Sequence, residues 1–172
     1  NMSTDIFVVD TQWLIERLEE EAQKEHPEKL RYVLRDLAVE SGAFAYEYTG
    51  YLANIHSVET YYQANIDMLD LHKFYSLFSP NQKIHTNVKN EEPTYYAPGC
   101  EVNTSQFASG SIVEGKVVRS VVSRNVQIHK DSLVKESIVF PRVVIGEGAQ
   151  VEYAIIDKGA EVADGVVIRG TA

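Results

Sequence analysis

The sequence predicts a mixed fold, in which an α/β segment over residues 1–75 and a connector over residues 76–110 precede a parallel β-helix over residues 111–172. The first observation is an aliphatic pattern that repeats every 17 residues from Val117 onward. One column of the repeat contains Val117, Val134, Val151 and Ile168, and a second contains Val121, Ile138 and Ile155. Self-similarity at a fixed period is the signature of a solenoid.

The second observation is the spacing of aliphatic residues within one period, which is 6, 6 and 5 residues. The residues at this spacing are Val122, Ile128, Val134, Val139, Ile145, Val151, Ile156, Val162 and Ile168. One inward residue on each of three short strands describes a triangular coil of the hexapeptide type, which buries its apolar side chains against the next coil. The third observation is that turn-forming residues mark one corner, namely Gly115, Asp131, Gly148 and Gly165.

Strands and helices are predicted to alternate in the N-terminal segment. Apolar residues at 6–9 and 44–48 indicate two short strands. Apolar residues that recur at helical spacing, some of them preceded by a polar residue that can cap a helix, indicate three helices. In chain order these are a helix capped by Asp10 or Thr11, a helix after Pro27, and a helix capped by Ser57 that runs to about Asp70.

Composition and charge narrow the classes of function. Residues 1–70 contain 14 acidic and 5 basic side chains, whereas residues 71–172 contain 11 of each. This balance argues against nucleic acid as a partner, because nucleic-acid binding needs clustered Lys and Arg. No membrane span or signal peptide is recognisable, and the single cysteine, Cys100, suits a reducing compartment, so we expect a cytoplasmic protein. Asn1 before Met2 resembles the remnant of an expression tag, and we expect a C-terminal piece of a longer protein.

The stretch from Gly50 to Asn65, GYLANIHSVETYYQAN, resembles a signature of sugar-phosphate nucleotidyltransferases, Gly-Tyr-Trp-x-Asp-[Ile/Val]-Gly-Thr followed by a helix that ends near Ala-Asn. Together with the repeats, it makes residues 3–172 similar to the family of glucose-1-phosphate adenylyltransferase, also called ADP-glucose pyrophosphorylase. The resemblance implies a left-handed β-helix and a role in glycogen synthesis. It also implies a reaction of ATP with glucose 1-phosphate that yields ADP-glucose and pyrophosphate, with Mg²⁺ in active members.

Several positions depart from the signature where chemistry would occur. By resemblance, the sugar-phosphate region comprises Gly50, Tyr51, Asn54, His56 and Ser57. Asn54 occupies the position of the family's metal-binding Asp, and its neutral amide cannot balance the charge of Mg²⁺. Leu52 replaces the Trp, and no Gly-rich phosphate loop occurs in the sequence. We therefore assign no catalytic residue and no metal ligand here, and the resemblance is closest to the catalytically impaired regulatory subunit type.

The resemblance also implies partners and an effector. A homologous catalytic adenylyltransferase subunit would be the partner, in a homo- or hetero-oligomer of two or four chains assembled in part through the β-helix. Effectors of this family are phosphorylated sugars or other anions, so outward basic residues are candidate contacts. These candidates are Arg119, Arg124, Lys130 and Arg142.

Two other functions stay open at this point. Asn also suits a loop with unusual backbone angles, so the chain can instead belong to an active adenylyl-, guanylyl- or uridylyltransferase. A hexapeptide acyltransferase is the second alternative, because such enzymes use a His as general base and His129 lies in the repeats. That reading leaves the stretch from Gly50 onward unexplained.

Overall fold

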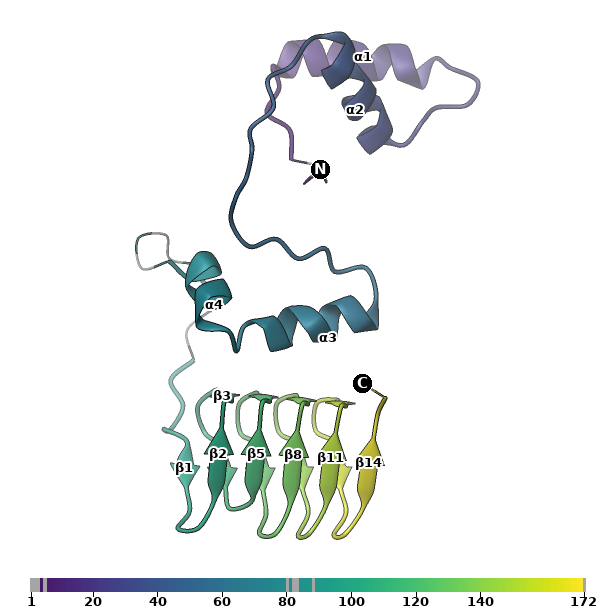
Figure 1. Cartoon of the computed structure of the whole chain (residues 1–172). Helices are drawn as coiled ribbons and strands as arrows, with labels where there is room; N and C mark the ends of the chain where they lie inside the picture. Colours follow the sequence, from purple (N-terminus) through teal and green to yellow (C-terminus); the bar gives the residue numbers. More distant parts are fainter. Residues whose placement is uncertain (1–3, 5, 80, 82–83, 88, 172) are drawn as a thin grey trace. The chain divides into compact units, whose positions relative to one another are not determined.

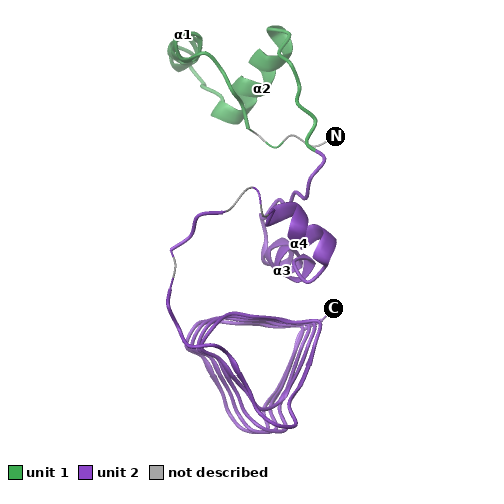
Figure 2. Cartoon of the chain, turned by 90° about the vertical axis from the view of Figure 1, so that its left-hand side faces the viewer, with its two compact units in different colours: residues 1–48 green, residues 49–172 purple. Residues whose placement is uncertain are grey.

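The computed structural model describes residues 4, 6–79, 81, 84–87 and 89–171. The chain forms two compact units, residues 1–48 and residues 49–172, which are coloured separately in Figure 2. In this division, the helices after residue 57 group with the β-helix.

Two helices make up the first unit. Helix α1 spans Thr11–Ala22, and the side chain of Asp10 caps it by accepting a hydrogen bond from the Trp13 main-chain N–H. Helix α2 spans Leu30–Glu40, so both predicted helices are confirmed. Residues 6–9 and 44–48 are not strands, which corrects both strand predictions. A strand is stabilised by pairing, and the described residues offer these two segments no partner strand.

The second unit begins with the loop 49–57 and two further helices (Figure 1). Helix α3 spans Val58–Asp67 and begins with a capping box, in which Ser57 and Thr60 bond each other's main-chain N–H groups. The predicted cap is thus confirmed, although the helix ends three residues before Asp70. Asp70 caps the short helix α4, Leu71–Leu77, which the sequence analysis did not predict.

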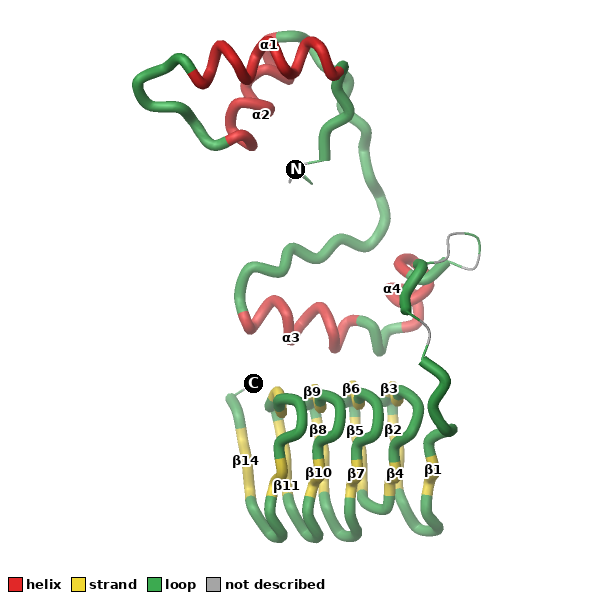
Figure 3. Tube along the Cα trace, turned by 180° about the vertical axis from the view of Figure 1, so that it is seen from behind, coloured by secondary structure: helices red, strands yellow, loops and turns green. Residues whose placement is uncertain are grey.

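The rest of the second unit is a parallel β-helix built from three sheets, as Figure 3 shows from behind. The first sheet contains β1 (Tyr95–Tyr96), β4 (Ile112–Val113), β7 (Gln127–Ile128), β10 (Val144–Ile145) and β13 (Glu161–Val162). The second contains β2 (Glu101–Asn103), β5 (Lys116–Val118), β8 (Leu133–Lys135), β11 (Gln150–Glu152) and β14 (Val167–Arg169). The third contains β3 (Gln106–Phe107), β6 (Val121–Val122), β9 (Ile138–Val139) and β12 (Ile155–Ile156).

The predicted solenoid is confirmed, but its first coil begins earlier than residue 111. Tyr95 already pairs with Ile112, so three strands lie in the predicted connector. The 17-residue pattern missed this coil because Lys116 pairs with Glu101, only 15 residues earlier. The corner between β4 and β5 consists of Glu114 and Gly115 alone, which is two residues shorter than the equivalent corners that follow.

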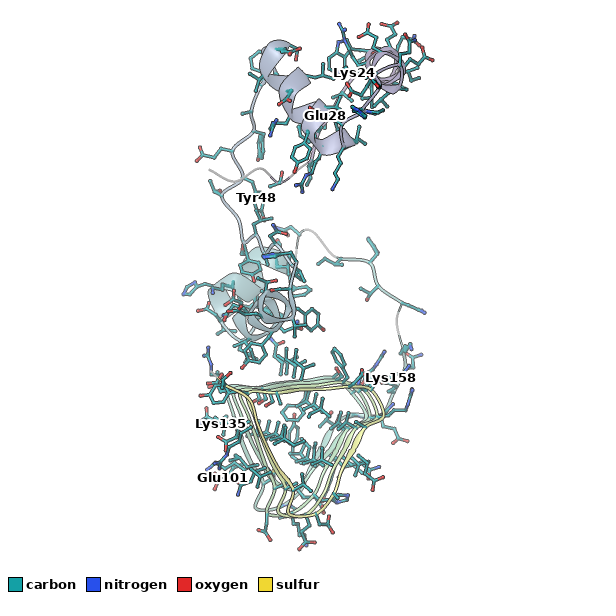
Figure 4. The ribbon with its side chains drawn as sticks, turned by 90° about the vertical axis from the view of Figure 1, so that its right-hand side faces the viewer. Lys24, Glu28, Tyr48, Glu101, Lys135 and Lys158 are labelled. Atoms are coloured by element: carbon teal, nitrogen blue, oxygen red, sulfur yellow. The ribbon has the colours of Figure 1, made fainter. Side chains whose placement is uncertain are left out.

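The interior of the coils holds the aliphatic residues that the repeat singled out. Val122, Ile128 and Val134 are at most 1% exposed, and their equivalents in the next coil are fully buried. Figure 4 shows these side chains filling the triangular cross-section, while the labelled Glu101, Lys135 and Lys158 lie on its outside. Stacking of like residues on successive coils is thus the main source of stability here.

Serines link the coils at the corner between the second and third sheets. The Ser105 hydroxyl accepts a hydrogen bond from the Ser120 main-chain N–H at 3.1 Å, and Ser120 accepts one from the Ser137 N–H at 3.1 Å. Ser137 in turn accepts a bond from the Ala154 N–H at 3.2 Å. This ladder explains the column of small residues in the repeat, because a larger side chain would separate the coils at this corner.

Gly146 and Gly148, which lie at one later corner, are expected to differ in their tolerance of the same substitution. A Cβ at Gly146 would lie 2.7 Å from the Asp164 main-chain N and 2.8 Å from the Ala163 carbonyl carbon, whereas Gly148 has open space and a φ of +67°. Asn tolerates that left-handed conformation, as Asn125 with a φ of 56° already shows. We therefore expect Gly146→Asn to lower the free energy of unfolding by about 2 kcal/mol, and Gly148→Asn to change it by less than about 0.5 kcal/mol. Urea denaturation followed by circular dichroism measures both; equal losses would contradict the coil contact at Gly146.

Helix α3 covers the outer face of the third sheet. Val121, Ile138 and Ile155 point outward from this sheet, yet Ile138 is only 1% exposed. The Tyr62 hydroxyl on α3 donates to the Glu136 carbonyl at 2.6 Å, and the Tyr61 ring meets the Phe140 ring edge-on at 6.3 Å. At the other end of the sheet, Gln106 donates to the Met68 carbonyl at 2.7 Å. The second aliphatic column of the repeat, Val121, Ile138 and Ile155, therefore belongs to the contact between α3 and the third sheet and not to the interior of the β-helix.

Candidate functional site

The loop 50–57 is the segment that resembles the nucleotidyltransferase signature, and it lies just before α3. Its residues from Leu52 to Ser57 are exposed, whereas Tyr51 is half-buried. Leu52 and Ile55 are 47% and 55% exposed, so this loop offers both apolar and polar groups to a ligand or a partner. The structure thus places the predicted residues Gly50, Tyr51, Asn54, His56 and Ser57 on one continuous, accessible stretch.

Two hydrogen bonds attach the start of this loop to the helices. The main-chain N–H of Tyr51 donates to the Ser76 hydroxyl on α4 at 2.8 Å. The Tyr51 hydroxyl donates to the Asp67 carboxylate at the end of α3, at 3.0 Å. Tyr51 is therefore held at its backbone and at the far end of its side chain.

Asp67 accepts hydrogen bonds from three different elements. Besides Tyr51, its donors are Lys73 on α4 at 2.6 Å and Gln63 on α3 at 2.9 Å. Desolvation opposes ionisation of this carboxyl, but the bonds from Lys73, Gln63 and Tyr51 outweigh it and hold the pKa of Asp67 below its ordinary value. Its contribution to stability is therefore present above the ordinary pKa and is lost as the pH falls through the lowered one. Desolvation first, and then the bond to Asp67, raises the pKa of Tyr51.

The other end of the loop is fixed by the start of α3. The His56 main-chain N–H donates to the Thr60 hydroxyl at 3.1 Å, and the His56 ring nitrogen Nδ1 lies 3.1 Å from the Asn54 carbonyl oxygen. The Ser57 hydroxyl accepts a bond from the Thr60 N–H at 3.1 Å. Asn54 thus sits between two fixed ends, with its side chain exposed.

The residues present do not fit a magnesium site. Asn54 supplies a neutral amide oxygen, whereas Mg²⁺ is bound in proteins through carboxylates and phosphates. Among the residues that the structure describes, no three His, Cys, Asp or Glu side chains lie close enough together to hold a metal ion. We derive no step through Mg²⁺ for this chain.

The four predicted anion contacts lie on different corners of the β-helix. Arg119, at the corner between β5 and β6, is paired with Glu136 at 2.9 Å. Arg124 is paired with Glu91 at 3.6 Å, and the Arg142 main-chain N–H donates to the Arg124 carbonyl on the neighbouring coil. Lys130 lies at a third corner, between β7 and β8. The structure therefore brings together Arg124 and Arg142, but not all four residues.

A hollow of about 260 Å³ lies at the shortened corner of the β-helix. Glu101, Lys116 and Asp131 are among its lining residues, and Lys116 pairs with Glu101 at 2.5 Å. Beside it, the His129 ring lies 3.3 Å from the Glu114 carboxylate. None of the residues predicted for the sugar-phosphate loop lines this hollow.

Known proteins are similar to this chain both in the β-helix and over nearly its whole length. A hexapeptide family described as "GlmU-like, C-terminal hexapeptide" matches residues 94–171, which is the β-helix. A glucose-1-phosphate adenylyltransferase of Bacillus cereus is 30% identical over 97% of this chain, and one of Corynebacterium jeikeium is 28% identical over 94% of it. A third, from Bacillus mycoides, is 32% identical over 73% of the chain.

This chain belongs to the glucose-1-phosphate adenylyltransferase family. The matches to the first two relatives include the loop 50–57 and the coils, because they span nearly the whole chain. The chain spans about 45% of the length of the Bacillus cereus relative and 44% of the length of the Corynebacterium jeikeium relative. Within the described residues, no helix has the length and apolarity that a membrane crossing requires.

Sequence reasoning singled out Tyr51 but missed the residues that hold it. Asp67, Lys73 and Ser76 carry no motif. Asp67 and Ser76 bond Tyr51, and Lys73 bonds Asp67, only because α3 and α4 fold back beside the loop. One signal was present: Asp67 and Gln63 are four residues apart on one helix face, which allows a hydrogen bond between them.

Proposed function

We propose that this chain is part of a subunit that acts in ADP-glucose synthesis, and that the subunit is regulatory and not catalytic. The parent reaction transfers the adenylyl group of ATP to glucose 1-phosphate and releases pyrophosphate. The family membership supports the first half of this proposal. The regulatory role depends on which groups the loop 50–57 offers to a sugar phosphate and to a metal ion.

Asn54 is the observation that carries the regulatory role. It is exposed on the loop that resembles the family's sugar-phosphate segment, at the position of the metal-binding Asp. An amide at this position can accept a hydrogen bond from a sugar hydroxyl, but it adds no negative charge to hold a dication. The loop is held at both ends, which supports a fixed sugar-phosphate segment in this proposal, and Asn54 gives it no charged group for the metal.

The β-helix suits a role in assembly and regulation in this proposal. Its outer faces carry paired charges, including Lys135 and Arg169 on either side of Glu152, at 4.0 Å and 2.9 Å. The corner with Arg124 and Arg142 is the one where two candidate anion contacts share adjacent coils. We propose this corner for an anionic effector, and a homologous catalytic subunit as the partner.

Pyrophosphate release from ATP and glucose 1-phosphate tests the proposal in the full-length protein. We expect no measurable release by the protein alone, and a changed rate or substrate affinity when it is mixed with a catalytically active relative. Robust turnover by the protein alone would overturn the regulatory role and favour an active nucleotidyltransferase.

The substitution Asn54→Asp makes this test specific to the loop. We expect it to give magnesium-dependent pyrophosphate release at least about tenfold above the detection limit below which the wild type stays, because a carboxylate restores a charged ligand. Asn103→Asp is the matched control, since it adds the same charge on an exposed strand and keeps an acceptor for the Thr104 hydroxyl. An equal response to both substitutions would show that the added charge acts nonspecifically.

A further inference from the structure

We propose that Asp67 is the positioning residue of the loop 50–57, and that it acts on this loop through the Tyr51 side chain. The inference rests on the proposed function for the identity of the ligand, a sugar phosphate. It does not depend on whether the subunit is catalytic.

The first step is that Asp67, at the end of α3, joins its own helix to the loop and to α4. Its carboxylate accepts from Tyr51 in the loop, from Lys73 on α4 and from Gln63 on α3. Its side chain is 17% exposed, and that of Lys73 is 44% exposed. A charge-assisted bond that is largely shielded from water is stronger than a neutral one, so this carboxylate is a firm attachment point.

The second step is that Tyr51 transmits this attachment to the loop. Its side chain reaches Asp67, while its backbone N–H donates to Ser76. Rotation of the phenol away from Asp67 would break the bond between the side chain of Tyr51 and the end of α3. Leu52 to His56 follow directly and are exposed, so their direction depends on how Tyr51 is held.

The third step concerns the alternative that Asp67 serves only the stability of α3 and α4. In that case Lys73 and Gln63 would suffice as its partners, and Tyr51 would be a passive neighbour. The two roles predict different behaviour for the loop. A stabilising role changes the melting of the whole unit, whereas a positioning role changes the loop before the unit melts.

Hydrogen exchange of the amides of residues 52–56 in the full-length, ligand-free protein separates these roles. We expect Tyr51→Phe and Asp67→Ala each to speed this exchange by about tenfold, since each removes the bond from phenol to carboxylate. We expect the double variant to be no faster than Asp67→Ala alone, because both residues act through one contact. Glu59→Ala is the control, as an exposed acidic residue of the same helix, and should leave the loop unchanged.

The titration of the Tyr51 phenol reports separately whether its bond to the Asp67 carboxylate forms in solution. With labelled tyrosine, and the signal assigned by its absence in Tyr51→Phe, we expect the phenol pKa to fall toward its ordinary value in Asp67→Ala and not in Glu59→Ala. Unchanged loop exchange in both Tyr51→Phe and Asp67→Ala, or additive effects in the double variant, would overturn the proposal. Added glucose 1-phosphate tests the proposed function separately: absence of protection at residues 52–56 in the wild type would count against the ligand and leave the role of Asp67 standing.

Discussion

Replacement of Ile145 by Asp is expected to unfold the β-helix. Ile145 is fully buried, and its strand β10 is paired with β7 on one side and β13 on the other. Its inward neighbours on those strands are Ile128 and Val162, so a carboxylate there would meet only aliphatic groups. A buried, unpaired carboxylate costs about 3 kcal/mol or more, which is a large share of the ~5–15 kcal/mol that stabilises a typical domain.

The measurement is urea denaturation followed by far-ultraviolet circular dichroism. Gln127→Asp provides a matched control, because Gln127 lies on the adjacent strand β7 but points outward and is exposed. We expect the control to change the free energy of unfolding by less than about 0.5 kcal/mol. An Ile145→Asp protein that melts like the wild type would mean that the coil register is wrong.

The repeats allowed most of the β-helix to be predicted, since each inward residue faces its own equivalent one coil away. The register of Val134 on Val151 and of Ile145 on Ile128 follows directly from the 17-residue period. The coil at residues 95–107 was missed because the corner between β4 and β5, in the next coil, is two residues shorter, which breaks the period without breaking the pairing. A fixed-period argument detects only coils of equal length.

The N-terminal helices were predictable from their caps, whereas the strands were not. Asp10 and Ser57 act on their own helices within a few residues, so the information is local. The segments 6–9 and 44–48 have strand-like composition but need a partner from elsewhere, because composition alone does not form a sheet. The same limit applies to the site: the loop 50–57 was visible as a motif, but its contact with Asp67 is tertiary.

The structure explains why the second column of the repeat is aliphatic. Val121, Ile138 and Ile155 lie on the outward side of the third sheet, next to the inward residues Val122, Val139 and Ile156, so they do not fill the interior. An apolar row on the outside of a sheet needs a cover, and α3 provides it through Tyr61 and Tyr62. The second column therefore encodes the docking of the helix that follows the loop 50–57.

This docking leads to the second large expected effect, for Ile138→Asp. Although Ile138 points outward, it is only 1% exposed, so a carboxylate there would be buried between the sheet and α3 at a cost of about 3 kcal/mol. The hydrogen-exchange rate of the α3 amides is expected to rise along with the loss of stability, because the helix would lose the apolar surface on which it packs. Leu133→Asp is the control, since Leu133 also points outward, from the central strand β8 of the second sheet, and is only half-buried.

The control is expected to cost less than about 1 kcal/mol and to leave the exchange of the α3 amides unchanged. Equal costs for Ile138→Asp and Leu133→Asp, with α3 still protected in both, would show that α3 does not rest on the third sheet. The pair thus distinguishes a helix that is held by the β-helix from one that is merely tethered to it. In the first case the β-helix fixes α3, and through Asp67 and Tyr51 it also fixes the loop that carries Asn54.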